Sequence, residues 1–215
     1  ATPEIYTLSL HDALPIFVAP GAIREDRFGL GTVIASGCGS GAVAGAEALG
    51  TVPPGFAVAL DDLKTWSAAM FRAAVLYRQT GGMHCAALAL PAGAPKPAGP
   101  AAELSMEGAT GGIPAGTSYF VVREDVGRHN AVDKILGRGF VDRVDFSSAC
   151  ILTSGRIAAD MILKAAAARV PVVVSRSIPT TTAFQIAEKA GVTLVGRIGD
   201  DAPFVYTCPD SIRIT

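Results

Sequence analysis

The sequence predicts an α/β protein with a largely parallel sheet that is covered by helices on both faces. One observation is that apolar strands alternate with amphipathic helices over residues 149–198, an order that is typical of parallel sheets buried between two helical layers. Another is that polar turns at residues 125–129, 154–156 and 175–180 each follow a predicted strand. Because ligands bind such sheets at the carboxyl ends of the strands, we expect these turns to meet at one edge.

Hydrophobic spacing predicts the helices and strands along the chain. Residues 61–78 place apolar side chains, Trp66 and Met70 among them, on one face of a helix that Asp61 or Asp62 is expected to cap. Both large side chains are expected in the core. The remaining elements are predicted as strand 86–90, a loop rich in Pro, Ala and Gly at 91–117, strand 119–122, a helix that ends near Gly137, strand 149–153, helix 157–169, strand 170–175, helix 181–190 and strand 192–198.

Size and composition fit one hydrophobic core and exclude several functions. The chain has 215 residues, 50% of them hydrophobic and 17% charged, and its net charge is -1. Without a basic run it is not expected to bind nucleic acid or membrane surfaces. Its apolar runs are interrupted by Gly, Pro or charge, so we predict no membrane span and no signal peptide. The cysteines match neither a disulfide framework nor a metal site, which predicts free thiols in a reducing compartment: Cys38, Cys85, Cys150 and Cys208.

The chain divides into three parts on these criteria. Residues 1–16 resemble a translated sequencing adapter more than a natural N-terminus, and we assign them no function. Residues 17–60 form a segment around Cys38. Residues 61–215 form the α/β domain, with the low-complexity loop at 91–117.

Cys38 lies in a glycine loop at residues 36–41, between a β-branched stretch and an Ala-rich helix candidate at 42–49. Glycines leave the thiol unshielded, and the positive end of the helix favours the reactive thiolate. A flexible loop with a passive thiol is the alternative. A further one is a dinucleotide fingerprint, Gly37-x-Gly39-x-x-Ala42, but the acidic residue that should follow about 20 residues later is not at the end of a strand.

The most polar stretch is residues 124–134, which lies at a switch from strand to helix. The first helical N–H groups have no partners at such a junction, so it suits an anionic, hydrogen-bonding ligand. The alternative is a capped helix start with a solvated charged face. His84 and Cys85 follow a glycine turn, and because side chains alternate across a strand they are expected to face opposite sides. His84 is therefore either a hydrogen-bonded turn residue or part of the site, but not a partner of Cys85.

Several motifs together resemble one known family. They are Thr80-Gly81-Gly82-Met83-His84, Glu124-Asp125-Val126-Gly127-Arg128-His129-Asn130-Ala131-Val132-Asp133-Lys134, Ser154-Gly155-Arg156, Lys164-Ala165 and Ser175-Arg176-Ser177-Ile178-Pro179-Thr180. In this order they closely resemble the FdhD family of formate dehydrogenase accessory proteins, or sulfur carrier proteins. The likeness extends from about Gly31 to the C-terminus.

The resemblance implies a three-layer fold similar to the cytidine deaminases, with helices on both faces of the sheet but without the deaminase zinc site. Zinc deaminases carry His-x-Glu and Pro-Cys-x-x-Cys at the starts of two helices. This chain has His129-Asn130-Ala131 and Ser154-Gly155-Arg156 in the corresponding places. Neither the glutamate nor the thiolate pair is present there, so deamination is excluded on chemical grounds.

The resemblance also implies a function. Family members are expected to be cytoplasmic homodimers that take sulfur from a cysteine desulfurase as a cysteine persulfide. They pass it to the bis-molybdopterin guanine dinucleotide cofactor before the cofactor enters the formate dehydrogenase catalytic subunit. The alternative is a chaperone that binds this cofactor without carrying sulfur. A nicotinamide dehydrogenase built on the glycine loop is a third, weaker hypothesis.

Cys38 matches the first cysteine of the family's Cys-Gly-x-Cys-Gly loop, so the resemblance makes it the sulfur acceptor. Gly41 stands where the second cysteine is expected, and Cys85 could replace that thiol only if its turn brings it within reach. The N-terminal segment that family members carry before the loop is missing or replaced, and the 91–117 loop is longer than usual. We therefore also expect that the chain could be a truncated reading frame.

The same motifs supply the predicted cofactor-binding residues: His84, Asp125, Gly127, Arg128, His129, Asn130, Asp133, Lys134, Ser154, Gly155, Arg156, Ser175, Arg176, Ser177 and Thr180. The three arginines are candidates for phosphate, whose oxygens match the guanidinium fork. Asp125 is a candidate acceptor for the guanine N–H edge. Ser175, Ser177 and Thr180 are candidates for donating to phosphate or ribose. His129 is expected to orient the ligand or move a proton. For each arginine, an ion pair with Glu124 or Asp133 is the structural alternative.

Overall fold

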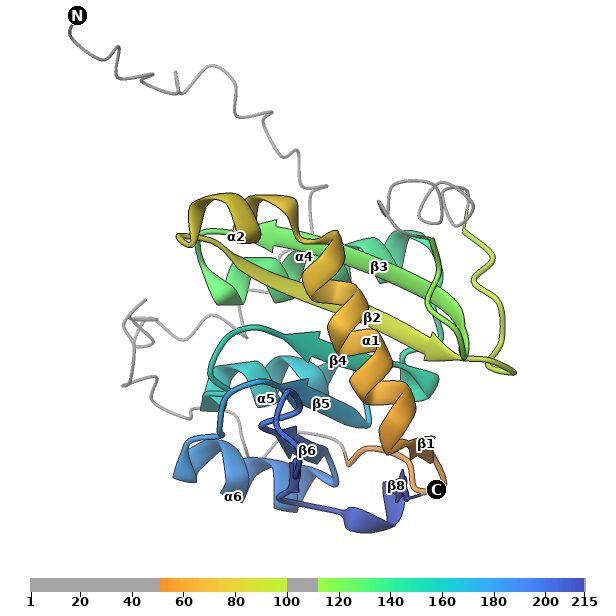
Figure 1. Cartoon of the computed structure of the whole chain (residues 1–215). Coiled ribbons are helices and arrows are strands. Elements are labelled where there is room, and N and C mark those ends of the chain that lie inside the picture. Colours follow the sequence, from red (N-terminus) through yellow and green to blue (C-terminus); the bar gives the residue numbers. More distant parts are fainter. Residues whose placement is uncertain (1–50, 100–111, 215) are drawn as a thin grey trace, which may run out of the picture. The chain divides into compact units, whose positions relative to one another are not determined.

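The structure, a computed structural model, describes residues 51–99 and 112–214 (Figure 1). Within these residues a 6-stranded sheet has the order β3-β2-β4-β5-β6-β7. Its strands are β2 (His84–Pro91), β3 (Thr117–Asp125), β4 (Cys150–Thr153), β5 (Val172–Ser175), β6 (Thr193–Gly196) and β7 (Phe204–Val205). The helices are α1 (Leu60–Ala73), α2 (Val75–Thr80), α4 (Arg128–Val141), α5 (Ala159–Ala167) and α6 (Thr181–Ala190), with 3-10 turns at Phe146–Ser148 and Pro209–Ser211.

The sheet is mixed, so the expectation of a largely parallel sheet is wrong in this respect. β2 pairs antiparallel with both β3 and β4, and β6 with β7, whereas β4, β5 and β6 are parallel. The reason is the connection: a loop joins β2 to β3, while α5 and α6 form the crossovers that parallel neighbours require. Because β3 and β4 both run antiparallel to β2, they point in the same direction as each other. β5 and β6 are parallel to β4 and share that direction. Their carboxyl ends therefore share one edge.

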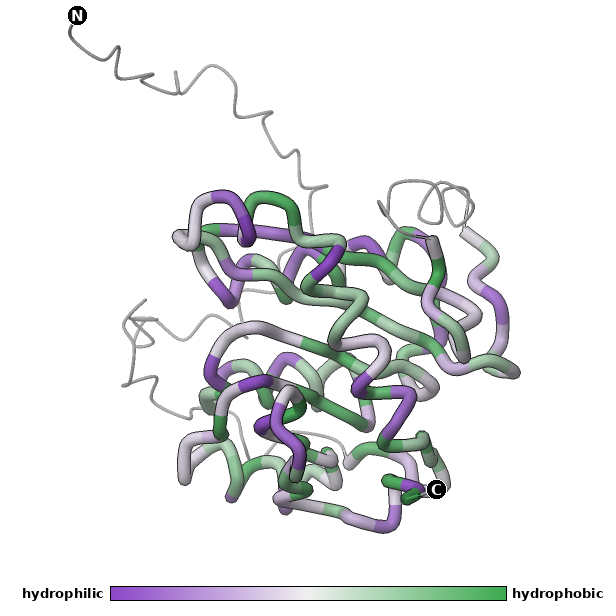
Figure 2. Tube along the Cα trace, in the orientation of Figure 1, coloured by the Kyte–Doolittle hydropathy of each residue, from purple (hydrophilic) through white to green (hydrophobic). Residues whose placement is uncertain are grey.

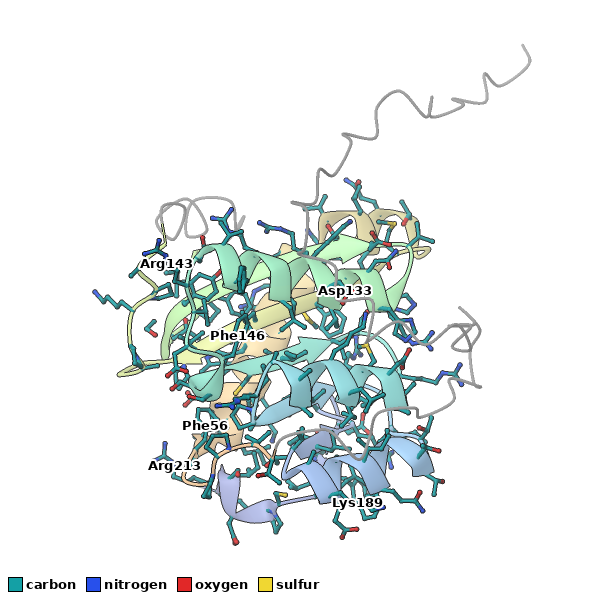
Figure 3. All side chains as sticks on the ribbon, turned by 180° about the vertical axis from the view of Figure 1, so that it is seen from behind. Phe56, Asp133, Arg143, Phe146, Lys189 and Arg213 are labelled. Carbon is teal, nitrogen blue, oxygen red and sulfur yellow. The ribbon has the colours of Figure 1, made fainter. Side chains whose placement is uncertain are left out.

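Helices cover both faces of the sheet, as predicted (Figures 1 and 3). α4, α5 and α6 lie on one face, and α1 lies on the other. Because strand side chains alternate, β2 contributes to both cores. Leu88 belongs to the core under α4 and α5, whereas Cys85 packs in the core under α1 with Trp66 and Met70. Trp66 and Met70 are each 0% exposed, which confirms that they are core residues.

The predicted helix at 61–78 is in fact two helices that meet at Ala74. The Glu124 carboxylate accepts hydrogen bonds from Leu76 N at 3.1 Å and Tyr77 N at 2.6 Å. In one continuous helix those two amides would bond to carbonyls of the preceding turn. A side chain distant in sequence takes them instead, so the helical ladder is interrupted and α2 starts anew.

The predicted cap of the first helix is also wrong. Ala59 occupies the N-cap position and no side chain caps it, while Asp61 and Asp62 lie in the first turn of α1. Negative charge is favourable there because it opposes the helix dipole. Figure 2 shows hydrophilic and hydrophobic residues alternating along α1, which matches a helix that is covered on one side only.

Residues before α1 pack with the α/β domain. Val52 N donates to Ala190 O at 2.8 Å, and Val52 is buried. β1 (Val58–Ala59) pairs in parallel with β8 (Ile212–Arg213), which ties this segment to the C-terminal region. No helix within residues 51–99 and 112–214 is long and apolar enough to cross a bilayer.

Candidate functional site

The edge where β3, β4 and β5 end gathers the three predicted polar turns, and we call it the rim: residues 125–129, 154–156 and 175–180. β3 ends at Asp125, whose register partner on β2 is His84. Thr153 at the end of β4 is in register with Ser175 at the end of β5. The expectation that the three turns meet at one edge is therefore confirmed, and His84 joins them from the start of the antiparallel strand β2.

A hydrogen-bonded network fixes the turn between β3 and α4. Asp125 Oδ1 accepts from Gly127 N at 2.9 Å and from Asn130 Nδ2 at 3.1 Å, and Asp125 Oδ2 lies 2.6 Å from Lys134 Nζ. Lys134 Nζ also donates to Glu124 O at 3.0 Å. The bond from Lys134, followed by that from Gly127, lowers the pKa of Asp125 to about 2. In this arrangement Asp125, Asn130 and Lys134 set the shape of the turn.

Ser154 attaches the turn after β4 to the beginning of β2. Its Oγ lies 3.2 Å from His84 Nδ1 and accepts from Cys85 N at 3.0 Å, while Ser154 N donates to Cys85 O at 2.9 Å. Burial, and then the nearby charges of Arg128 and His129, lower the pKa of His84. The contact with Ser154 thus places His84 at the rim, near Arg128 and His129.

Glycine at position 155 allows Arg128 to lie across the turn after β4. A Cβ on Gly155 would be 2.8 Å from Arg128 Cβ and 2.9 Å from its Cδ, closer than side chains approach. Gly155 N donates to Thr153 Oγ1 at 3.1 Å, which keeps the turn against the strand end. Arg156, the next residue, is exposed. Two predicted phosphate-binding arginines therefore belong to adjacent parts of the rim.

The turn after β5 uses its hydroxyl groups largely within the protein. Ser175 is 1% exposed; its Oγ donates to Gly155 O at 2.7 Å and accepts from Ser177 N at 2.9 Å. The hydroxyl proton of Ser175 is used in the bond to Gly155 O, so Ser175 links two turns here. Its donation to phosphate or ribose stays a prediction. Thr180 caps α6 by accepting from Ala183 N at 3.2 Å.

Arg176, the third predicted phosphate-binding arginine, is held against an aromatic ring. Its guanidinium carbon lies 4.8 Å from the centre of the Phe71 ring on α1. Stacking on an aromatic face is a favourable setting for a guanidinium group. α1 therefore helps to place a cation that belongs to the turn after β5.

Carboxylates on α4 and α5 form contacts between the two helices. His129 Nε2 lies 2.6 Å from Asp160 Oδ2, and Lys164 Nζ lies 2.5 Å from Asp133 Oδ2. Figure 3 shows Asp133 on the side of α4 that is turned toward α5. Asp133, predicted as a ligand contact, is thus in an ion pair with Lys164. The Glu124 carboxylate, the other suggested partner for an arginine, instead binds the first amides of α2.

Two of the described thiols, Cys85 and Cys150, are buried in the core under α1. Cys85 is 0% exposed and lies on the opposite face of β2 from His84, which confirms that the two do not pair. Burial raises the pKa of Cys85 to about 11, and burial also raises the pKa of Cys150. Cys85 is therefore poorly placed to replace the missing second loop cysteine. Cys38, the loop at 36–41 and the Gly37–Ala42 fingerprint lie outside the described residues.

Two residues that shape the site were not among the predicted set. Glu124 holds the start of α2, which leads through Gly81 into β2 and His84. Asp160 lies against His129, with 2.6 Å between Oδ2 and Nε2. The spacing of Asp160 and Lys164, which matches that of His129 and Asp133 on α4, is the signal in the sequence that could have indicated this pairing. Within residues 51–99 and 112–214 no group of three or more His, Cys, Asp or Glu residues could hold a metal ion.

The fold and the rim define a class: an α/β protein whose strand ends carry arginines, imidazoles and helix N-termini suited to an anionic ligand. Comparison with known proteins gives the family. The model of the FdhD/NarQ family matches residues 109–213. The chain is 32% identical over 212 residues to a sulfur carrier protein FdhD of Mycobacterium tuberculosis, covering 95% of this chain and 68% of that protein. The chain belongs to the FdhD/NarQ family.

Other relatives agree with this assignment. A sulfur carrier protein FdhD of Methanothermobacter thermautotrophicus is 33% identical over 180 residues, which span 84% of this chain and 62% of that protein's length. Among solved structures, a formate dehydrogenase accessory protein from Desulfotalea psychrophila superposes with a TM-score of 0.59 and 25% identity, covering 77% of this chain and 60% of that one. The mixed α/β architecture is thus one that a member of the family shares.

Proposed function

We propose that this protein is a sulfur carrier that moves sulfur from a cysteine desulfurase to the bis-molybdopterin guanine dinucleotide cofactor, in support of formate dehydrogenase. The names of its relatives, sulfur carrier protein and formate dehydrogenase accessory protein, support this role. The observation that carries the proposal is the rim, where Arg128, Arg156 and Arg176 stand beside the N-terminus of α4 and two imidazoles. Such a surface suits the diphosphates of a nucleotide-bearing cofactor.

In the proposed transfer, Cys38 accepts the sulfur. The Cys38 thiolate attacks the outer sulfur of the desulfurase persulfide, the S–S bond on the desulfurase breaks, and its cysteine leaves as a thiolate. Cys38 then carries the persulfide, and no external oxidant or reductant is consumed. The partners in this scheme are a cysteine desulfurase, the cofactor as substrate and the formate dehydrogenase catalytic subunit. We further propose a cytoplasmic homodimer with a fold related to the cytidine deaminases.

The test is intact mass after incubation with a cysteine desulfurase and cysteine. We expect the folded protein to gain about 32 Da, the mass of one persulfide sulfur, and to lose it on reduction. Cys38→Ala should gain nothing. Cys85→Ala is the matched control, since its buried thiol with a raised pKa is not expected to accept sulfur. Equal gain in wild type and Cys38→Ala would overturn the role of Cys38.

A chaperone that binds the cofactor without carrying sulfur is the second candidate. The burial of Cys85 favours it, because Gly41 stands in place of the second loop cysteine and the Cys85 thiol, although next to His84, is 0% exposed. Activation of formate dehydrogenase separates the two proposals. A carrier loses activation in Cys38→Ala but still binds a guanine nucleotide, whereas a chaperone retains both.

A further inference from the structure

The backbone on both sides of Arg176 is fixed by hydrogen bonds to the segment after β6. Ile198 N donates to Ser175 O at 3.1 Å, and Arg197 N donates to Ser177 O at 3.1 Å. Ser177 N also donates to Ser175 Oγ at 2.9 Å. The turn after β5 is therefore anchored immediately before and immediately after Arg176, and its side chain starts from a defined point of the rim.

Two groups contact the Arg176 side chain. The ring of Phe71 lies under its guanidinium, with 4.8 Å between the guanidinium carbon and the ring centre. Gly199 is the other neighbour, and a Cβ there would be 3.1 Å from Arg176 Nε and 3.8 Å from its Cγ. Glycine at this position thus leaves room for the arginine that a larger residue would crowd.

Phe71 is itself held in place from two directions. It is partly buried and packs against the core under α1, and its ring centre lies 5.4 Å from that of Tyr77 on α2. Tyr77 N in turn donates to the Glu124 carboxylate at 2.6 Å. These contacts run along the α1 face from the end of β3 to the turn after β5, so the ring under Arg176 has a fixed position.

The charge of Arg176 is not neutralised by the described part of the protein. Its side chain is exposed, and within residues 51–99 and 112–214 it donates no hydrogen bond and forms no ion pair. By contrast, Arg197 lies 2.7 Å from Asp200 Oδ2. A guanidinium that contacts a ring through its face keeps its N–H groups at the edge, where they match two oxygens of a phosphate.

We propose that Phe71 is a positioning residue of the rim, which holds the Arg176 guanidinium so that its N–H edge binds a phosphate group of the nucleotide. An exposed arginine has several rotatable bonds, and fixing them when a ligand binds costs free energy. The contact with Phe71 restricts this freedom before the ligand arrives. The inference rests on the proposed function, in which the rim binds the nucleotide part of the cofactor.

Calorimetric titration of the full chain with GDP tests this role. Phe71→Leu should weaken binding about two- to fivefold, the worth of one cation–π contact at an exposed site. Phe71→Tyr keeps the ring and should bind like wild type. Phe71→Leu with wild-type affinity would overturn the proposal.

The matched control is Phe56→Leu. Phe56, labelled in Figure 3, is another partly buried ring against the same core, but it precedes β1 and lies outside the rim. This variant should bind GDP like wild type. Equal losses in Phe56→Leu and Phe71→Leu would show that Phe71 acts only through the stability of the core, and would overturn the proposal.

A double-mutant cycle shows whether Phe71 acts through the arginine. Arg176→Ala should weaken GDP binding at least about tenfold, as expected for a charged hydrogen-bonding group. Phe71→Leu should cause no further loss in that background. An undiminished loss there, or full affinity in Arg176→Ala, overturns this inference but not the proposed function. If wild type binds no GDP, the proposed function fails and this inference fails with it.

Discussion

Single residues of the rim have two different roles: some side chains maintain its shape, and others remain available to a ligand. Asp125 is the clearest of the first kind, because both of its oxygens accept or pair within the turn. Ser175 is another, since it is buried and bonds to Gly155 O. Arg156 is exposed and has no such task in the described residues. A motif residue is therefore not automatically a ligand contact.

Replacing Lys134 by Met tests the role of Asp125 through pH. The pKa of Asp125 is lowered from 3.8 to about 2, so its carboxylate stabilises the fold above a pH of about 4 and loses this effect as the pH falls through about 2. Lys134→Met removes the largest cause of that lowering. The variant should therefore lose less stability on acidification than wild type, by at most about 1 kcal/mol because the pair is accessible to water.

Urea unfolding at a series of pH values measures this difference. Lys189→Met is the control, since Lys189 is an exposed lysine near the end of α6 and lies outside the rim. It should leave the pH dependence of stability as in wild type. An identical acid profile for Lys134→Met would show that the contact with Asp125 contributes nothing to folding.

Among the elements, α4 is the one that joins the rim to the core. Its first turn carries Arg128 and His129, and its later turns bury Ile135 and Gly139 against the sheet. Gly139 allows a close approach: a Cβ there would lie 2.6 Å from Leu88 Cδ2 and 2.9 Å from Phe146 Cε1. Helix propensity alone would favour alanine at this position.

Two glycines on α4 give a matched pair of substitutions. Gly139→Ala should destabilise the protein by about 1 to 3 kcal/mol, because overpacking outweighs the better helix propensity. Gly137→Ala should stabilise it by up to about 1 kcal/mol, since nothing lies within 4 Å of an added Cβ. Thermal and urea unfolding measure both. Similar effects of the two substitutions would contradict the close packing of α4 on β2.

For the whole molecule, the two cores on either side of the sheet decide which cysteines can react. Cys85 and Cys150 are both 0% exposed and belong to the core under α1. A thiol reacts as the thiolate, and burial raises the pKa of both groups. Their modification therefore requires the domain to open. Cys208 lies partly exposed beside the 3-10 turn Pro209–Ser211.

Alkylation with iodoacetamide near neutral pH tests this distribution. We expect Cys208 to be modified in the folded protein, slowly because its pKa is also raised, and Cys85 and Cys150 only after denaturation in urea. Peptide mass spectrometry assigns each site. Modification of Cys85 in the folded state at the rate of Cys208 would contradict the burial of β2.

Local features of this protein could be predicted from its sequence, because they depend on periodicity and on residue type. It predicted helices on both faces of a sheet, the core positions of Trp66 and Met70 and the helix at 181–190, whose bounds are those of α6. It also predicted that the polar turns share one edge, since that follows from strand direction. Motif order was enough to indicate the family.

Features that depend on groups far apart in the chain became visible only in the folded structure. Only folding brings Glu124 to the amides of α2, and that contact divides the helix predicted as one. The reversed direction of β2 is set by pairing with β3 and β4 and not by its own apolar residues. Likewise, Asp160 meets His129 only because α5 lies beside α4. Hydrogen bonds and ion pairs of this kind are selected by geometry, which no local pattern of residues encodes.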